Sequence, residues 1–108
     1  MAYSQEFRER AEAALSAVLP ITSRPMFGGV GIYSEGIFFA LIADAKLYFK
    51  VDETNRADYE QAGMQPFFPF DSPKPMHYWE VPDSVLTTSD ELLAWASRAI
   101  AVAQSKKR

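Results

Sequence analysis

Apolar residues are spaced differently in successive parts of the chain, and each spacing predicts a different kind of element. Between Ser4 and Leu19 they recur every three or four residues, with charged side chains between them. This repeat is typical of an amphipathic helix, with Ser4 as the expected N-cap and Pro20 at its end.

An alternating pattern follows and predicts three strands. It begins at Met26, is interrupted by turn residues at 33–36 and again at Asp44, and ends near Val51. Short connections between consecutive strands indicate an antiparallel meander. The middle segment, 37–43, is apolar at both odd and even positions, so we expect it at the centre of the sheet, covered on both faces.

The second half of the chain predicts two more helices and two short strands. Residues 52–62 indicate a short helix that ends at Gly63, and 88–91 have the spacing of a capping box at the start of a last helix. Between them, prolines restrict 67–68 and 76–81 to short extended pieces at a sheet edge or in loops.

These elements together predict an α+β domain. An antiparallel sheet, made of a three-strand meander and two short strands, is packed with helices in the order α-β-β-β-α-β-β-α. A length of 108 residues suits one domain, so 1–108 are expected to form a single unit, with 102–108 as a frayed tail.

Composition and charge argue against several classes of function. The sequence has 11 Lys and Arg against 14 Asp and Glu, a formal net charge of −3, so no direct binding to nucleic acid is expected. It has no cysteine, which excludes disulfides and cysteine metal sites. No stretch approaches the roughly 20 apolar residues that span a bilayer, and the expected location is the cytoplasm, with no membrane partner.

The residues that bear chemistry are few, and no catalytic, metal or cofactor site is expected. His77 is the only histidine, and no metal-ligand pair or nucleophile elbow accompanies it. The glycines at 28–31 precede a strand, which favours a bulged or closely packed strand over a phosphate loop. Asp52 is more simply explained as a helix cap than as a catalytic acid.

Several motifs, in order and over nearly the whole chain, carry a family resemblance. They are Arg24-x-Met26-Phe27-Gly28-Gly29-x-Gly31-x-Tyr33, Gly36-x-Phe38-Phe39-Ala40-Leu41-Ile42, Leu47-Tyr48-Phe49-Lys50-Val51-Asp52, Asn55-Arg56, Gly63-Met64-x-Pro66-Phe67 and Met76-x-Tyr78-x-Glu80-Val81-Pro82. With these motifs the chain resembles the TfoX N-terminal domain family, also called TfoX/Sxy.

The resemblance implies an α+β domain in a bacterial cytoplasm and a role as a transcriptional co-regulator of competence genes. The family has no established catalytic residues, so the resemblance implies none. Fuller regulators of the family carry a second, C-terminal helical domain, and this chain resembles the first domain alone. His77 and Trp79 stand where the family more often has Ser and Tyr.

The leading hypothesis is a non-enzymatic regulatory module that acts by binding another protein, with the transcription machinery as the candidate partner. The expected interaction patch consists of Arg24, Lys50, Asp52, Asn55, Arg56, Tyr78 and Glu80. Two alternatives stay open: direct nucleic-acid binding, and a small-ligand or enzymatic pocket near Gly28–Gly31 and Asp52–Arg56. A homodimer through an edge strand rich in Phe and Trp also stays open.

Overall fold

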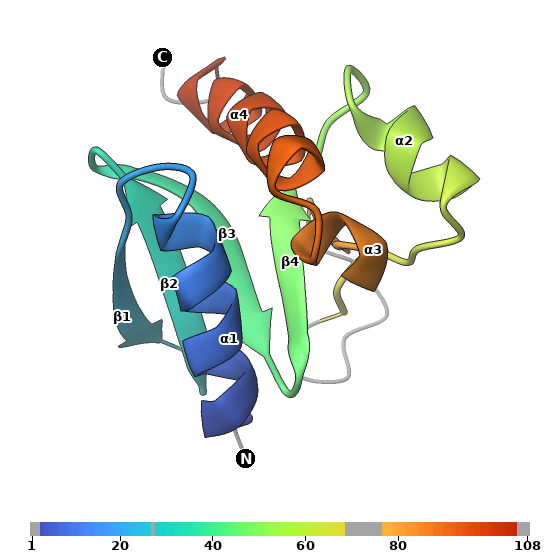
Figure 1. Ribbon diagram of the computed structural model, residues 1–108. Coiled ribbons are helices and arrows are strands. Elements are labelled where there is room, and N and C mark those ends of the chain that lie inside the picture. The colour runs from blue at the N-terminus through green and yellow to red at the C-terminus, as the bar shows by residue number, and fades with distance from the viewer. Residues whose placement is uncertain (1–2, 27, 69–76, 106–108) are drawn as a thin grey trace.

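The computed structural model describes residues 3–26, 28–68 and 77–105 (Figure 1). In chain order the elements are α1 (Gln5–Ser16), β1 (Thr22–Met26), β2 (Gly29–Ser34), β3 (Ile37–Ala43), β4 (Lys46–Lys50), α2 (Arg56–Gln61), β5 (Tyr78–Glu80), α3 (Asp83–Leu86) and α4 (Ser89–Ser105). None of the helices in these ranges is long and apolar enough to cross a membrane.

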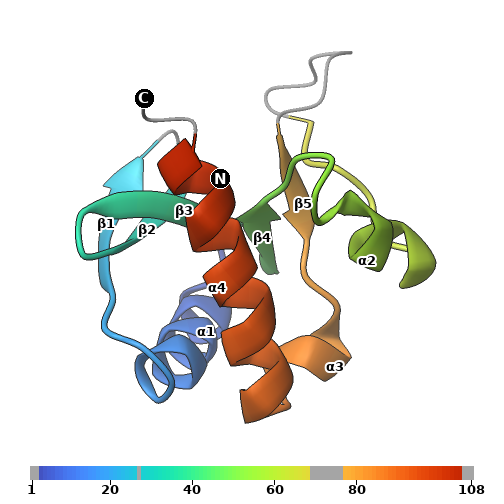
Figure 2. The ribbon, with the colours of Figure 1, turned by 90° about the horizontal axis from the view of Figure 1, so that it is seen from above.

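The strands form one antiparallel sheet in the order β1-β2-β3-β4-β5, which places β3 at the centre as its apolar pattern predicts. α1, α3 and α4 lie on one face of this sheet, and α2 lies beyond β5 (Figure 2). The opposite face, here called the helix-free face, carries no helix of the described residues (Figure 2). The predicted α+β fold class is confirmed.

The main core lies between the sheet and the helices. Its largest fully buried side chains come from both layers: Leu15, Ile32, Phe39, Phe49, Tyr59 and Leu92. The predicted N-cap of α1 is confirmed, because the hydroxyl of Ser4 accepts the backbone N–H of Phe7 at 3.1 Å.

A register shift in the β2–β3 pairing decides which side chains of β3 enter this core. Tyr33 pairs with Phe38, but Ile32 pairs with Ala40, so Phe39 is the extra residue. Such a bulge changes the alternation of side chains along the strand. Phe39 and Ala40 therefore both join the main core, whereas Phe38 lies on the helix-free face.

The N-terminal part of the sheet differs from the prediction. In place of one strand from Met26, the structure has β1 ending at Met26 and β2 beginning at Gly29, with Gly28 in a left-handed conformation (φ 78°) between them. β1 lacks apolar alternation and contains Pro25, which an edge strand tolerates because one of its sides is unpaired. The spacing of apolar residues therefore does not predict β1.

The segment before β5 is paired, although it forms no full strand. The backbone N–H of Phe67 donates to the carbonyl of Tyr78 at 2.8 Å, and that of Glu80 donates to the carbonyl of Gln65 at 3.0 Å. Residues 65–67 thus lie along the outer edge of β5, close to the predicted extended piece at 67–68. The strand part of 76–81 is limited to β5, and residue 76 lies outside the described residues.

Two predicted boundaries at helices are wrong, and one helix of the structure is absent from the prediction. α2 begins at Arg56 because residues 52–55 form a turn, and the short helix α3 was not predicted. The chain is helical through Ser105, with Val102 and Ala103 buried, so 102–105 are not a frayed tail. The predicted stop at Gly63 (φ 77°) is confirmed, because Met64 N–H donates to the carbonyl of Tyr59 as in a Schellman motif.

Candidate binding face

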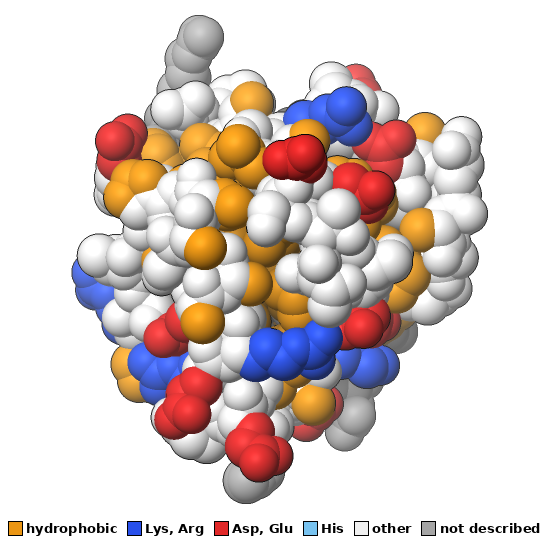
Figure 3. Space-filling model, in the orientation of Figure 1, with side chains coloured by type: hydrophobic (Ala, Val, Ile, Leu, Met, Phe, Trp, Pro, Cys, Tyr) orange, Lys and Arg blue, Asp and Glu red, His pale blue; other side chains and the backbone are white. Residues whose placement is uncertain are grey.

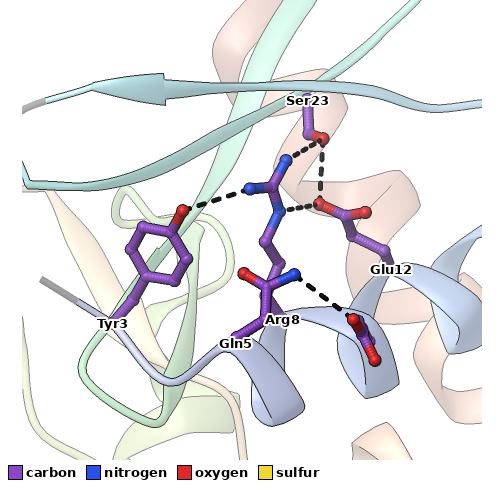
Figure 4. A network of polar contacts seen from close by, with 6 residues as sticks. Tyr3, Gln5, Arg8, Glu12 and Ser23 are labelled. Carbon is purple, nitrogen blue, oxygen red and sulfur yellow. Dashed lines mark hydrogen bonds and ion pairs between the residues drawn. The ribbon is translucent and has the colours of Figure 1, made fainter.

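A polar network fixes the direction of the side chains of β1. The guanidinium of Arg8 on α1 donates to Glu12 (2.7 Å), to the hydroxyl of Tyr3 (3.2 Å) and to the hydroxyl of Ser23 (3.4 Å), as Figure 4 shows. Ser23 in turn donates to Glu12 at 2.9 Å. Successive side chains of a strand point to opposite faces of the sheet. Since Ser23 faces α1, the side chain of Arg24 lies on the helix-free face.

Aromatic rings from three strands form a row across the helix-free face. The ring centres of Tyr33 (β2) and Phe38 (β3) are 5.1 Å apart and stacked, and those of Phe38 and Tyr78 (β5) are 5.6 Å apart. Beside this row, Tyr48 (β4) contacts Phe67 with ring centres 4.8 Å apart. These separations are typical of favourable aromatic pairs.

A cation lies over the ring at each end of this row. The guanidinium carbon of Arg24 is 5.2 Å from the ring centre of Tyr33, and Nζ of Lys50 is 5.0 Å from that of Tyr78. Both distances are within the range of cation–π attraction. The five residues Arg24, Tyr33, Phe38, Tyr78 and Lys50 are here called the cation–aromatic row.

Two tyrosines of this face, Tyr48 and Tyr78, remain protonated far above neutral pH. Burial raises the pKa of Tyr78 to about 12, and burial together with the nearby carboxylate of Glu80 raises that of Tyr48 to about 12. Both side chains are largely covered, with exposed fractions of 2% for Tyr78 and 8% for Tyr48. At neutral pH these tyrosines are uncharged hydroxyl groups on an apolar platform.

The predicted patch separates into three places. Arg24, Lys50 and Tyr78 meet in the cation–aromatic row. Glu80 lies on the same face, opposite Tyr48, with its carboxylate 3.8 Å from the ammonium of Lys46. The remaining members, at 52–56, occupy the connection from β4 to α2.

Asn55 has a structural role in that connection. Its side chain is 97% buried, its Oδ1 accepts the backbone N–H of Asp52 at 2.9 Å, and its Nδ2 donates to the carbonyl of Lys50 at 3.2 Å. Oδ1 of Asp52 accepts from Thr54, so Asp52 stabilises the turn and does not cap α2 itself. Arg56 is exposed, 3.8 Å from Glu60.

The glycines of β2 serve close packing. A Cβ at Gly29 would lie 2.3 Å from the carbonyl oxygen of Ile42, and one at Gly31 would meet the side chains of Met26 and Phe38. This agrees with the predicted closely packed strand. Gly29 lies beside Ile42, whereas Asp52 follows the far end of β4, so the two halves of the alternative pocket lie toward opposite ends of the sheet.

His77 is exposed just before β5, and its carbonyl accepts the backbone N–H of Val51 at 2.9 Å. Among residues 3–26, 28–68 and 77–105, no group of three or more His, Asp or Glu side chains is placed to hold a metal ion.

Sequence reasoning missed Tyr33 and Phe38, the two rings that connect Arg24 to Tyr78. The sequence pattern predicts Tyr33 in a turn, and the side on which Phe38 lies depends on the bulge at Phe39. The available signal for Tyr33 is its place in the same motif as Arg24, since cations and aromatic rings pair often.

A sheet with helices on one face and a cation–aromatic row on the other defines a two-layer α+β domain. The chain belongs to the TfoX N-terminal domain family, whose model matches residues 13–103. This confirms the family resemblance. Comparison with curated proteins gives no match.

Proposed function

We propose that this chain is a non-enzymatic, TfoX-like regulatory module that acts in the cytoplasm by binding another protein through its helix-free face. The cation–aromatic row is the observation that carries the proposal. It combines an exposed arginine with partly exposed aromatic rings, and Arg and aromatic residues are enriched in protein interfaces.

Ion pairs of the described residues occur on both sides of the molecule, and on the helix-free face Lys46 pairs with Glu80. On the helix-bearing side, Lys and Arg lie close to Asp and Glu, and hydrophobic side chains interrupt this polar surface (Figure 3). Arg10 on α1, for example, donates to Asp83 at 2.8 Å. No carboxylate of the described residues lies within ion-pair distance of Arg24 on the helix-free face. Arg24 is therefore the better candidate for contact with a partner.

Family membership supports the finer proposal of a transcriptional co-regulator related to competence. The net charge of −3 favours action through a protein partner over direct contact with DNA, since phosphate binding relies on excess Lys and Arg.

Affinity capture from bacterial cytosol tests the proposal. The bait is the whole chain, compared with the double variant Arg24→Gln/Lys50→Gln and with Arg10→Gln as a matched control on the other side. We expect a partner that the wild type and Arg10→Gln retain and the double variant loses. Capture of nothing beyond the bare resin contradicts protein binding, and salt-sensitive retention of DNA alone favours the nucleic-acid alternative.

A further inference from the structure

A short segment, residues 56–64, contacts both tryptophans of the sequence. It consists of α2 and the three residues that follow it, and α2 lies beyond β5 (Figure 2). The ring of Tyr59 packs edge-on against Trp95 on α4, with ring centres 4.6 Å apart, and against Trp79 on β5, with ring centres 6.4 Å apart. The segment therefore covers the junction between α4 and β5 through one side chain.

Both ends of this segment are fixed to the sheet. Before it, the buried side-chain amide of Asn55 donates to the carbonyl of Lys50 at the end of β4, at 3.2 Å. After it, the carbonyl of Gln65 accepts the backbone N–H of Glu80 on β5, at 3.0 Å. Residues 56–64 thus lie between two fixed points, and their movement requires no change in the pairing of either strand.

Between these points the segment is attached by few side chains. Among the described residues, its backbone N–H groups donate only to carbonyls within 52–64. Tyr59 is the only buried residue of α2, and Met64 is half-buried against the main core. Asp58 forms an ion pair with Arg98 on α4, but these side chains are 38% and 56% exposed, and exposed ion pairs contribute little to stability.

The main attachment also carries an unfavourable polar group. The hydroxyl of Tyr59 is buried and has no hydrogen-bond partner among the residues that the structure describes. A buried hydroxyl without a partner raises the free energy of the closed segment, and solvent satisfies the same hydroxyl when the segment opens. Ring packing and hydroxyl desolvation therefore act in opposite directions at Tyr59.

We propose that residues 56–64, here called the α2 lid, open and close over Trp79 and Trp95 while the sheet and α4 remain folded. Segments with few buried contacts open at a lower free-energy cost than the whole fold. Once detached, α2 loses its internal hydrogen bonds, because a helix of six residues is unstable in isolation. Opening exposes both indole rings at the junction of α4 and β5. This inference goes beyond the proposed function and does not depend on it.

Amide hydrogen exchange of the whole chain, followed by NMR at several low denaturant concentrations, tests the lid. Local opening exposes little surface, so its rate is insensitive to denaturant, whereas exchange through global unfolding accelerates. The backbone N–H groups of Ala62, Gly63 and Met64 are hydrogen-bonded within the segment. We expect them to exchange about a hundredfold faster than the amides of β3, or more, and without dependence on denaturant.

Two variants change the attachments of the lid in opposite directions. Tyr59→Phe removes the unpaired hydroxyl and should slow exchange of the lid amides about tenfold. Arg98→Gln removes the ion pair with Asp58 and should speed it about two- to fivefold. Arg10→Gln is the matched control, since it removes the ion pair with Asp83 elsewhere and should leave lid exchange unchanged. Circular dichroism confirms that each variant is folded.

Exchange of the lid amides at the rate and with the denaturant dependence of β3 overturns the proposal, because these residues would then open only by global unfolding. Unchanged lid exchange in both Tyr59→Phe and Arg98→Gln overturns it as well, because opening would not involve these attachments. Neither result bears on the proposed function, which cytosolic capture tests separately.

Discussion

Asn55 is hydrogen-bonded through both ends of its side-chain amide to the backbone of the strand end that precedes it. Its Nδ2 donates to the carbonyl of Lys50, whose side chain closes the cation–aromatic row, and its Oδ1 accepts the N–H of Asp52. The buried side chain of Asn55 thus fixes the backbone at Lys50, and the side chain of Lys50 belongs to the binding face.

Replacing Asn55 with Ala should destabilise the fold. The substitution leaves the N–H of Asp52 and one bond of the Lys50 carbonyl unsatisfied, so we expect a loss of about 2 kcal/mol in the free energy of unfolding. Chemical denaturation measures it, with Thr54→Ala as the control because its bonds to Asp52 are exposed. A loss no larger than that of the control contradicts the structural role.

Removing the hydroxyl of Tyr59 should not destabilise the fold, in contrast to the loss of the Asn55 side chain. This hydroxyl is buried and has no hydrogen-bond partner among the residues that the structure describes, while the ring of Tyr59 packs edge-on against Trp95 with centres 4.6 Å apart. Tyr59→Phe removes only the unsatisfied group, so we expect stability to be unchanged or to rise by about 1 kcal/mol. Tyr59→Ala should lose about 3 to 5 kcal/mol because it empties the core position. A large loss in Tyr59→Phe would mean that the hydroxyl has a partner.

Alanine substitutions at Gly29 and Gly31 compare two kinds of close contact made by β2. Gly29→Ala places a methyl against the rigid carbonyl of Ile42, whereas Gly31→Ala meets the flexible end of Met26 and the ring of Phe38. We expect Gly29→Ala to cost about 3 kcal/mol or more and Gly31→Ala clearly less, measured by thermal and chemical unfolding. Equal effects would contradict the close approach of β2 to β3.

Alkaline pH should weaken the fold through the buried tyrosines. In the folded chain the pKa of Tyr48 and of Tyr78 is raised to about 12, against about 10 in an unfolded chain. The unfolded state therefore loses protons first, and stability is fully present below about pH 10 and falls between about pH 10 and 12.

Denaturant midpoints across this alkaline range measure the loss, and Tyr78→Phe should make the decline shallower because one shifted group is removed. An identical pH dependence in the wild type and in Tyr78→Phe would contradict the burial of this hydroxyl as the cause.

The sequence predicts most of the sheet, because the spacing of apolar residues in β3 and β4 is typical of strands. It does not predict β1, an edge strand of mostly exposed residues that contains Pro25. Nor does it predict the bulge at Phe39, which depends on how β2 and β3 pair and not on either strand alone. α3 is only four residues long, too short for a helical repeat to be recognised.

Three members of the predicted patch meet on one face: Arg24, Lys50 and Tyr78. The sequence between them does not indicate which residues connect them in space. Two rings that sequence reasoning missed, Tyr33 and Phe38, connect them across the sheet. The sequence predicts Asn55 in the same patch because a polar residue at a helix start suggests an exposed surface. Only the tertiary structure shows that its side chain is buried against the backbone.

Site-specific photo-crosslinking in cells tests the central claim, that the helix-free face contacts another protein, most directly. p-Benzoylphenylalanine is introduced at Tyr33 and, as the control, at Leu93, which is 41% exposed on α4. The account predicts a discrete adduct with another protein from the Tyr33 position and none from Leu93. An adduct from Leu93 only, or none from Tyr33, would contradict it.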